Sequence, residues 1–382
     1  MNMRGCRYHL RPVLPSFSPA REHPRRMNRT KRRQRNARTI NDVALKAGVS
    51  PMTVSRVING ESVVRAQTRE KVERAIAALD YSPSAAARSL AGGEETRIAL
   101  LHSNPSASYL SEFLVDSVDQ ASRSGVDLVV EKWDGESAVD SWVKHLLRSR
   151  INGVILPPPL CDNQGMQRAL TGAGILAVGV ATGEASAEMS AVSIDDRAAA
   201  LTMTRHLIAL GHWQIGFIKG DPGLSASERR LEGYRHALKD AGIAADPALV
   251  TQGDFTYRSG LSAAERLLPL AERPSAIFAS NDDMAAAAVA AAHRSGLEVP
   301  SDISVCGFDD TLLATAIWPE LTTIRQPVSA MARAAVELPV KQIKGREGEA
   351  GGSPDRLLLD YELVRRQSDG RQLPLRRWRG PR

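Results

Sequence analysis

The 382-residue sequence predicts a small all-α headpiece followed by a large α/β core with mostly parallel sheets. Segments with apolar residues at helical spacing fill residues 39–90, and they predict the headpiece. From Arg97 onward, short apolar runs alternate with amphipathic stretches, which is typical of parallel strands covered by helices on both faces. About 270 residues are long for one such domain, so we expect two lobes in the core.

Composition divides the chain further. The first 38 residues combine prolines with arginines, show no apolar period and are expected to be disordered, with Met27 as an alternative start. The predicted parts are the basic extension 1–38, the headpiece 39–83, a hinge helix and linker 84–93, the core 94–364 and an Arg-rich tail 365–382.

The net charge of +7 does not by itself indicate nucleic-acid binding, because most of the positive charge lies in the two ends of the chain. The extension carries +11 and the tail +6, whereas the headpiece with its linker carries +2 and the core −12. The two basic ends predict only weak attraction to phosphate that is independent of base sequence.

Three further observations exclude other classes of protein. No apolar run approaches the roughly 20 residues that a membrane helix needs, and no apolar segment follows the N-terminal arginines as a secretory signal requires. The three cysteines, Cys6, Cys161 and Cys306, are far apart, so they fit neither a disulfide framework nor a zinc site. We therefore expect a cytoplasmic protein.

In the core, apolar runs predict strands at Ile98–Leu101, Val126–Val130, Gly153–Leu156, Leu176–Val180, Gln214–Ile218, Ala248–Gln252, Ala276–Ala279, Ile303–Phe308 and, last, Arg356–Val364. Amphipathic stretches predict helices at Ser111–Ser122, Arg197–Leu210, Ala226–Ala241, Gly260–Leu270 and Met284–Arg294. Ligands of such sheets bind beyond the carboxyl ends of the strands, so the residues after each run are the candidates for a binding site.

The start of the headpiece predicts a helix-turn-helix. Thr39 is a suitable N-cap, and Asp42 three residues later completes a capping box. Gly48 ends the first helix. Ser50 can cap the second, with Pro51 at the first helical position, where a missing N–H costs little. Two short helices joined by a turn with glycine form this motif.

The second helix has one apolar and one polar face. Its polar face carries Thr53, Ser55, Arg56 and Asn59. Short polar side chains around one arginine suit the major groove of DNA, where arginine pairs with guanine through two hydrogen bonds. A third helix over Thr68–Asp80 is expected to add Val72, Ile76 and Leu79 to a small core.

Four motifs resemble the LacI/GalR family of transcription regulators. Three lie in the headpiece, and the fourth is similar to that family's hinge helix: TINDVA at 39–44, AGVS at 47–50, TVSRVIN at 53–59 and YSPSAAARSL at 81–90. The resemblance continues more loosely to about residue 365. It implies a two-lobed core like that of periplasmic sugar-binding proteins.

The resemblance also implies which headpiece residues contact DNA. They are Thr39, Ser50, Pro51, Met52, Thr53, Ser55, Arg56, Asn59, Tyr81, Ala87 and Leu90. Pro51 and Met52 cannot make paired hydrogen bonds to a base, so we expect apolar contacts there, and Arg56 is the expected guanine reader. The segment Ser84–Leu90 is too short for a stable isolated helix. In the family two copies fold in the minor groove, where Leu90 would wedge between base pairs.

Five core residues after predicted strands resemble the effector-binding residues of the family: Tyr109, Arg230, Phe255, Asn281 and Asp309. Arg229 lies beside the predicted arginine, but the spacing to Gly233-Tyr234 favours Arg230. Planar Arg, Asn and Asp groups around an aromatic face suit the hydroxyls of a sugar or sugar phosphate.

The predicted function is a homodimeric, DNA-binding repressor of a carbohydrate-utilisation operon, which a sugar-like effector releases from a pseudo-palindromic operator. No cofactor, metal or catalytic activity is expected, because no Walker A, H-E-x-x-H or G-x-S-x-G motif is present. The sequence also lacks a leucine heptad repeat that would join two dimers. The alternatives are an activator, a regulator with a protein or non-sugar corepressor, and a sugar-binding protein for transport.

Overall fold

The computed structural model describes residues 39–58, 63–79, 81, 96–103, 106–133, 139–183, 186–346 and 354–372. Contacts divide the chain into two units, Met1–Gly93 and Glu94–Arg382. The predicted basic extension, the predicted hinge helix with Ala87 and Leu90, Asn59, and residues 373–382 of the predicted tail lie outside the described residues.

The headpiece contains the predicted helix-turn-helix, formed by α1 (Ile40–Ala47) and α2 (Pro51–Ile58). The capping box is present: the Thr39 hydroxyl accepts from the Asp42 N–H, and the Asp42 carboxylate accepts from the Thr39 N–H at 2.7 Å. Gly48 ends α1 with a φ of 66°, a left-handed conformation that glycine adopts without strain.

A third helix, α3 (Ala66–Leu79), completes the headpiece and begins two residues before the predicted start. Val72 is fully buried, and Ile76 and Leu79 pack against the same core, as predicted. The core also contains Tyr81, which is 8% exposed and whose N–H donates to the Ile76 carbonyl. Tyr81, a predicted DNA contact, therefore has its side chain packed in the headpiece core.

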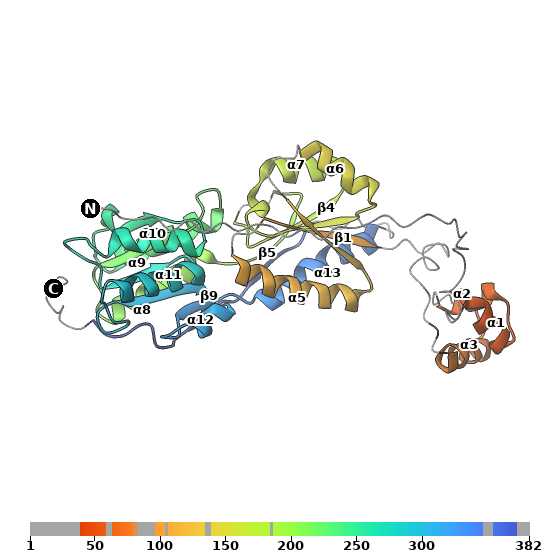
Figure 1. Ribbon diagram of the computed structural model, residues 1–382. Coiled ribbons are helices and arrows are strands. Elements are labelled where there is room, and N and C mark those ends of the chain that lie inside the picture. Colours follow the sequence, from red (N-terminus) through yellow and green to blue (C-terminus); the bar gives the residue numbers. More distant parts are fainter. Residues whose placement is uncertain are drawn as a thin grey trace, which may run out of the picture. The chain divides into compact units, whose positions relative to one another are not determined.

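The core unit has two lobes, each built on a six-stranded sheet (Figure 1). In lobe 1 all strands are parallel, in the order β11-β5-β4-β3-β1-β2. Their bounds are β1 Arg97–His102, β2 Asp127–Lys132, β3 Gly153–Leu156, β4 Leu176–Val180, β5 Ser190–Ile194 and β11 Arg356–Leu359. The helices are α5 Ala107–Ser124, α6 Val139–Arg148, α7 Gln164–Gly172 and α13 Val328–Arg346. Figure 1 shows α5 and α13 on one face of this sheet and α6 and α7 on the other.

Lobe 2 has the strand order β12-β10-β9-β8-β6-β7, parallel except for β12. Its strands are β6 Ile215–Lys219, β7 Val250–Gln252, β8 Ala276–Ala279, β9 Ser304–Asp309, β10 Thr322–Arg325 and β12 Glu362–Val364. Its helices are α8 Asp196–Ala209, α9 Ser225–Asp240, α10 Tyr257–Leu267, α11 Asp282–Arg294 and the short α12 Leu312–Ala316. Single-turn 3₁₀ helices occupy Leu160–Asp162 in lobe 1 and Pro247–Leu249 in lobe 2.

Two predictions for the end of the core were wrong. The single strand expected at Arg356–Val364 is two strands, because β11 pairs with β5 in lobe 1 and β12 pairs with β10 in lobe 2. The core also continues to residue 372. Ser368 is fully buried, and the Asp369 carboxylate lies within hydrogen-bond distance of His206 Nε2, at 2.7 Å. These polar residues gave no apolar signal, since hydrogen bonds rather than apolar packing hold the segment.

No described helix combines the length and the apolar character that a membrane crossing requires.

Candidate functional site

The first candidate site is the exposed face of α2. Ser50 caps this helix, since its hydroxyl accepts from the Thr53 N–H at 3.2 Å and lies 2.9 Å from the Thr53 hydroxyl. Pro51, Met52 and Arg56 are exposed, Met52 at 65%. The other face of α2 is buried in the headpiece core, and this burial fixes which side chains face outward.

A shallow hollow adjoins this face, and it is lined by Val49, Ser50, Thr53, Arg56, Val63, Val64, Arg65 and Thr68. Arg65 and Thr68 were not among the predicted residues. They flank the start of α3, where unpaired backbone N–H groups favour anions. Guanidinium and hydroxyl groups beside a helix start suit phosphate oxygens of a DNA backbone. The sequence signal that could have found Arg65 is its place as a basic residue directly before α3.

The other predicted DNA-binding residues of the described helices differ in exposure. Thr53 and Ser55 on α2 are half-buried, while Thr39 is exposed but engaged in the capping box of α1. The structure thus brings Ser50, Thr53 and Arg56 together around one hollow and gives Thr39 a role in helix capping.

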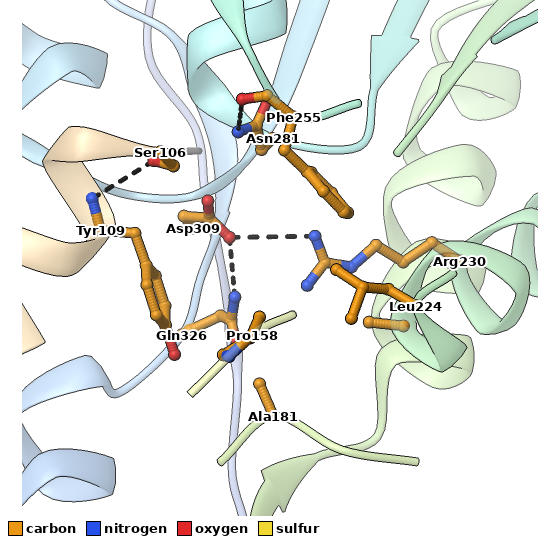
Figure 2. Close-up of a pocket in the computed structure, with 11 residues that line it drawn as sticks. Ser106, Tyr109, Pro158, Ala181, Leu224, Arg230, Phe255, Asn281, Asp309 and Gln326 are labelled. Carbon is orange, nitrogen blue, oxygen red and sulfur yellow. Dashed lines mark hydrogen bonds and ion pairs between the residues drawn. The ribbon is translucent and has the colours of Figure 1, made fainter. Parts of the chain in front are cut away.

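The second candidate site is a cavity between the two lobes (Figure 2). Its lining contains all five predicted effector residues and six others: Ser106, Tyr109, Pro158, Ala181, Leu224, Ala226, Arg230, Phe255, Asn281, Asp309 and Gln326. About 430 Å³ of space between these residues is not filled by atoms, a volume that includes open solvent. The lining residues follow the carboxyl ends of strands of both sheets, as expected for α/β ligand sites.

Arg230 lies at the centre of the charged groups and is 4% exposed. Its Nε donates to the Asp196 carboxylate at 2.7 Å, and one terminal nitrogen donates to the Ser280 carbonyl at 2.5 Å. The same nitrogen is 3.9 Å from Asp309, and the guanidinium lies 3.6 Å from the ring centroid of Phe308. A buried cation needs such partners. Asp196, the first residue of α8, fixes the direction of Arg230.

Asp309 faces Arg230 from the end of β9 and accepts a hydrogen bond from the Gln326 side chain at 2.7 Å. Burial raises the pKa of Asp309 to about 7, although the Arg230 guanidinium acts in the opposite direction. The carboxyl therefore changes charge near neutral pH. Gln326 follows β10, a strand that the sequence did not reveal, so its place in the cavity was also missed.

Two polar atoms at this cavity have no hydrogen-bond partner among the described residues: the Tyr109 hydroxyl and the Gln326 side-chain oxygen. Buried polar groups in proteins are nearly always paired. Burial raises the pKa of Tyr109, so its hydroxyl stays protonated and can donate. A hydroxyl donor and an amide acceptor facing a cavity mark places where a polar ligand would bind.

Asn281 lines the cavity, but its amide is largely used to hold the backbone. The side-chain oxygen caps α11 by accepting from Met284 N–H at 2.9 Å, and the nitrogen donates to the Phe255 carbonyl at 2.9 Å. Phe255 has a φ of 69°, unusual for a residue other than glycine. Its ring covers Gly220, where an added Cβ would lie 2.0 Å from the ring. Asn281 thus positions the aromatic wall of the cavity.

Left-handed backbone recurs at this site. Besides Phe255, the cavity residues Ala181 (φ 54°) and Asp309 (φ 114°) and the adjacent Asp310 (φ 60°) have positive φ values. Each such residue costs of order 1–3 kcal/mol, and strain of this kind gathers at ligand sites. Nowhere in the described residues do three or more His, Cys, Asp or Glu side chains gather as a metal site would require.

Comparisons with known proteins agree with this architecture. Residues 39–84 match the family model of bacterial regulatory proteins, lacI family, and residues 204–368 match that of a periplasmic binding protein-like domain. The HTH-type transcriptional regulator CelR of Thermobifida fusca is 36% identical over 342 residues, which cover 88% of this chain and 99% of that protein.

Solved structures show the same likeness. A complex of transcriptional regulator CelR with cellobiose is 33% identical, with a TM-score of 0.66 over 87% of this chain and 99% of that one. A lac repressor dimer bound to operator and an anti-inducer is 32% identical, with a TM-score of 0.70 and the same coverage. This chain belongs to the LacI family of bacterial regulatory proteins, which are DNA-binding regulators of transcription.

Proposed function

We propose that this regulator represses a carbohydrate-utilisation operon and leaves its operator when an uncharged sugar binds between the lobes. The observation that carries this proposal is that the Tyr109 hydroxyl and the Gln326 oxygen have no partner among the described residues, in a cavity that Arg230 and Asp309 also line. Donors and acceptors around an aromatic wall suit sugar hydroxyls. The similarity to a regulator whose structure contains cellobiose supports a glucoside-type sugar.

The charges around the cavity favour an uncharged effector over a sugar phosphate. Asp196 and Asp309 both lie against Arg230, so this buried cation already has two carboxylate neighbours. Asp283 adds a third carboxyl group close to Asp309. A phosphate in this cavity would meet these groups without a further buried cation among its lining residues.

We further propose roles for the DNA-facing residues. Arg56 pairs with a guanine, while Pro51 and Met52 contact thymine methyl groups in the major groove. Two headpieces bind the half-sites of a pseudo-palindrome, and Leu90, together with Ala87, acts at its centre as the family resemblance implies. These roles are supported by the exposure of α2 and remain proposals for this chain.

The DNA-bound form is proposed to be a cytoplasmic homodimer without catalytic activity. Large apolar side chains are exposed on both lobes: Val115 and Val118 on α5, and Leu312 and Trp318 in and after α12, the last two at 80% and 75%. Exposed apolar groups of this size are typical of interfaces between subunits. Access to chromosomal DNA requires the cytoplasm.

The test combines operator selection with sugar binding. Full-length protein first selects its operator from fragments of the genome that encodes it, and its affinity for that DNA is then measured with and without cellobiose, glucose and glucose 6-phosphate. We expect cellobiose or glucose to weaken operator binding by at least about tenfold, in the range of allosteric coupling, and glucose 6-phosphate to have no effect. A response to the phosphate alone would overturn the charge argument, and no response to any sugar would overturn the effector proposal.

A further inference from the structure

Hydrogen bonds join the two lobes directly at one edge of the cavity. Asp162 of lobe 1 accepts from the Ser225 backbone N–H at 2.9 Å and from the Ser225 hydroxyl at 2.7 Å. Ser225 is the first residue of α9 in lobe 2. Its hydroxyl in turn accepts from the Gly183 N–H of lobe 1 at 2.8 Å. We call Asp162, Ser225 and Gly183 the cross-lobe contact.

This contact supplies a helix cap that lobe 2 itself does not provide. The N-cap residue of α9 is Leu224, whose side chain makes no capping hydrogen bond. The helices α8, α10 and α11 are instead capped within their own lobe, by Asp195, Thr256 and Asn281. A carboxylate at a helix start pairs with N–H groups that lack intrahelical partners and is favoured by the helix dipole. For α9, Asp162 provides this carboxylate from the opposite lobe.

The lobe 1 side of the contact is equally specific. The other oxygen of Asp162 accepts from the Thr182 hydroxyl at 2.5 Å, which fixes the carboxylate. Arg229 on α9 donates to the Gly183 carbonyl at 2.7 Å. A Cβ at Gly183 would lie 2.1 Å from the Arg229 side chain, which would have to move to admit a larger residue there.

The contact lies where it can act on the cavity. Leu224 and Ala226, the neighbours of Ser225, both line the cavity. Arg230, about one and a half turns further along α9, also lines it. Asp162 does not line the cavity. Any loosening of the start of α9 would therefore move cavity residues without removing a ligand contact.

We propose that Asp162 is a positioning residue of the effector cavity: by capping α9 from the opposite lobe, it holds the lobes together around the cavity and keeps Arg230 in place. This inference rests on the proposed function of the cavity as the effector site. It adds an acidic residue outside the lining whose loss weakens effector binding by letting the lobes separate at this edge.

Hydrogen–deuterium exchange of the full-length, ligand-free protein tests the proposal. The amides of Gly183 and Ser225 are each protected by an acceptor on the opposite lobe. In Asp162→Ala we expect both amides to exchange at least about tenfold faster, a factor typical of a lost hydrogen bond to a charged group. Acceleration at Gly183 is the informative result, because the acceptor of that amide, the Ser225 hydroxyl, is intact in this variant.

Ser225→Ala gives the reciprocal test. It removes the acceptor of Gly183 but leaves Asp162 able to accept from the amide of residue 225. The proposal expects this amide to exchange faster as well. Asp246→Ala is the matched control, since Asp246 caps a short helix inside lobe 2 by accepting from the Ala248 N–H. It should leave both cross-lobe amides unchanged.

Faster exchange confined to residue 225 in Asp162→Ala would overturn the proposal, because Asp162 would then be only a local cap. The same holds if Asp246→Ala accelerates Gly183 and Ser225 equally. The assay contains no sugar, so a failure of cellobiose to bind would refute the proposed effector and leave this result unaffected.

Discussion

Two buried tyrosines of the core make a matched pair that tests whether the cavity is built for a ligand. The Tyr109 hydroxyl has no partner in the described residues, whereas the Tyr234 hydroxyl donates to the Ile215 carbonyl at 2.8 Å. Both rings stack on a phenylalanine, Tyr109 on Phe113 and Tyr234 on Phe217. Replacement by phenylalanine keeps each stack and removes only the hydroxyl.

The expected effects on stability have opposite signs. Tyr109→Phe removes a buried hydroxyl without a partner among the described residues, so the free energy of unfolding of the ligand-free protein should stay the same or rise by about 1 kcal/mol. Tyr234→Phe leaves the buried Ile215 carbonyl without its donor and should lower the free energy of unfolding by about 1–2 kcal/mol. Urea unfolding of the two variants and the wild type measures the difference.

In ligand binding, we expect Tyr109→Phe to have the larger effect of the two variants. If the Tyr109 hydroxyl donates to a sugar, Tyr109→Phe should weaken cellobiose binding by about 1 kcal/mol, or about fivefold in Kd, measured by calorimetry. Tyr234→Phe should leave the Kd unchanged, since Tyr234 is absent from the cavity lining. The reasoning is refuted if Tyr109→Phe destabilises the ligand-free protein as much as Tyr234→Phe does, because the hydroxyl would then be paired already.

Three further predictions concern charge and capping. Arg230→Met leaves Asp196 and Asp309 buried without their cation and should lower the free energy of unfolding by about 3–5 kcal/mol at pH 8. Burial raises the pKa of both carboxyls, so they protonate as the pH falls, and urea unfolding at pH 5.5 should show a smaller loss; a pH-independent loss would contradict the ion-pair account. Because the pKa of Asp309 is about 7 and a sugar hydroxyl would favour its ionised form, cellobiose affinity should rise between pH 6 and pH 8 in calorimetry. Asp309→Asn should abolish that slope, and an unchanged slope would exclude Asp309 as its source. In the headpiece, Thr39→Ala removes the capping box and should cost about 1 kcal/mol, seen as a lower melting temperature of the headpiece, whereas an unchanged melting temperature would show that the box contributes little.

The headpiece was predicted closely because its signals are local. Thr39, Asp42, Gly48 and Pro51 act on backbone groups within a few residues of themselves, so their spacing alone sets where α1 and α2 begin and end. The exception is Tyr81, whose burial depends on packing into the core that the three helices share.

In the core, apolar runs revealed the central strands but not β5, β10 or α13. The strands β5 and β10 are short and rich in serine or threonine, and α13 contains Pro339, which argues against a helix when only the sequence is considered. These segments are stabilised by their neighbours in the two lobes. Gln326 was missed for this reason, because it follows β10.

The sequence by itself determined the headpiece and the α/β class of the core, because these follow from local capping and from apolar periodicity. Its resemblance to the LacI/GalR family indicated the five side chains at strand ends. Only the tertiary structure decided which groups meet. It paired Arg230 with Asp196, gave Asn281 its role behind Phe255 and placed Asp162 of one lobe against Ser225 of the other at the edge of the cavity. The last pair is separated by 63 residues and lies on different lobes. Such contacts depend on where the chain crosses between the sheets, which no local pattern of residues encodes.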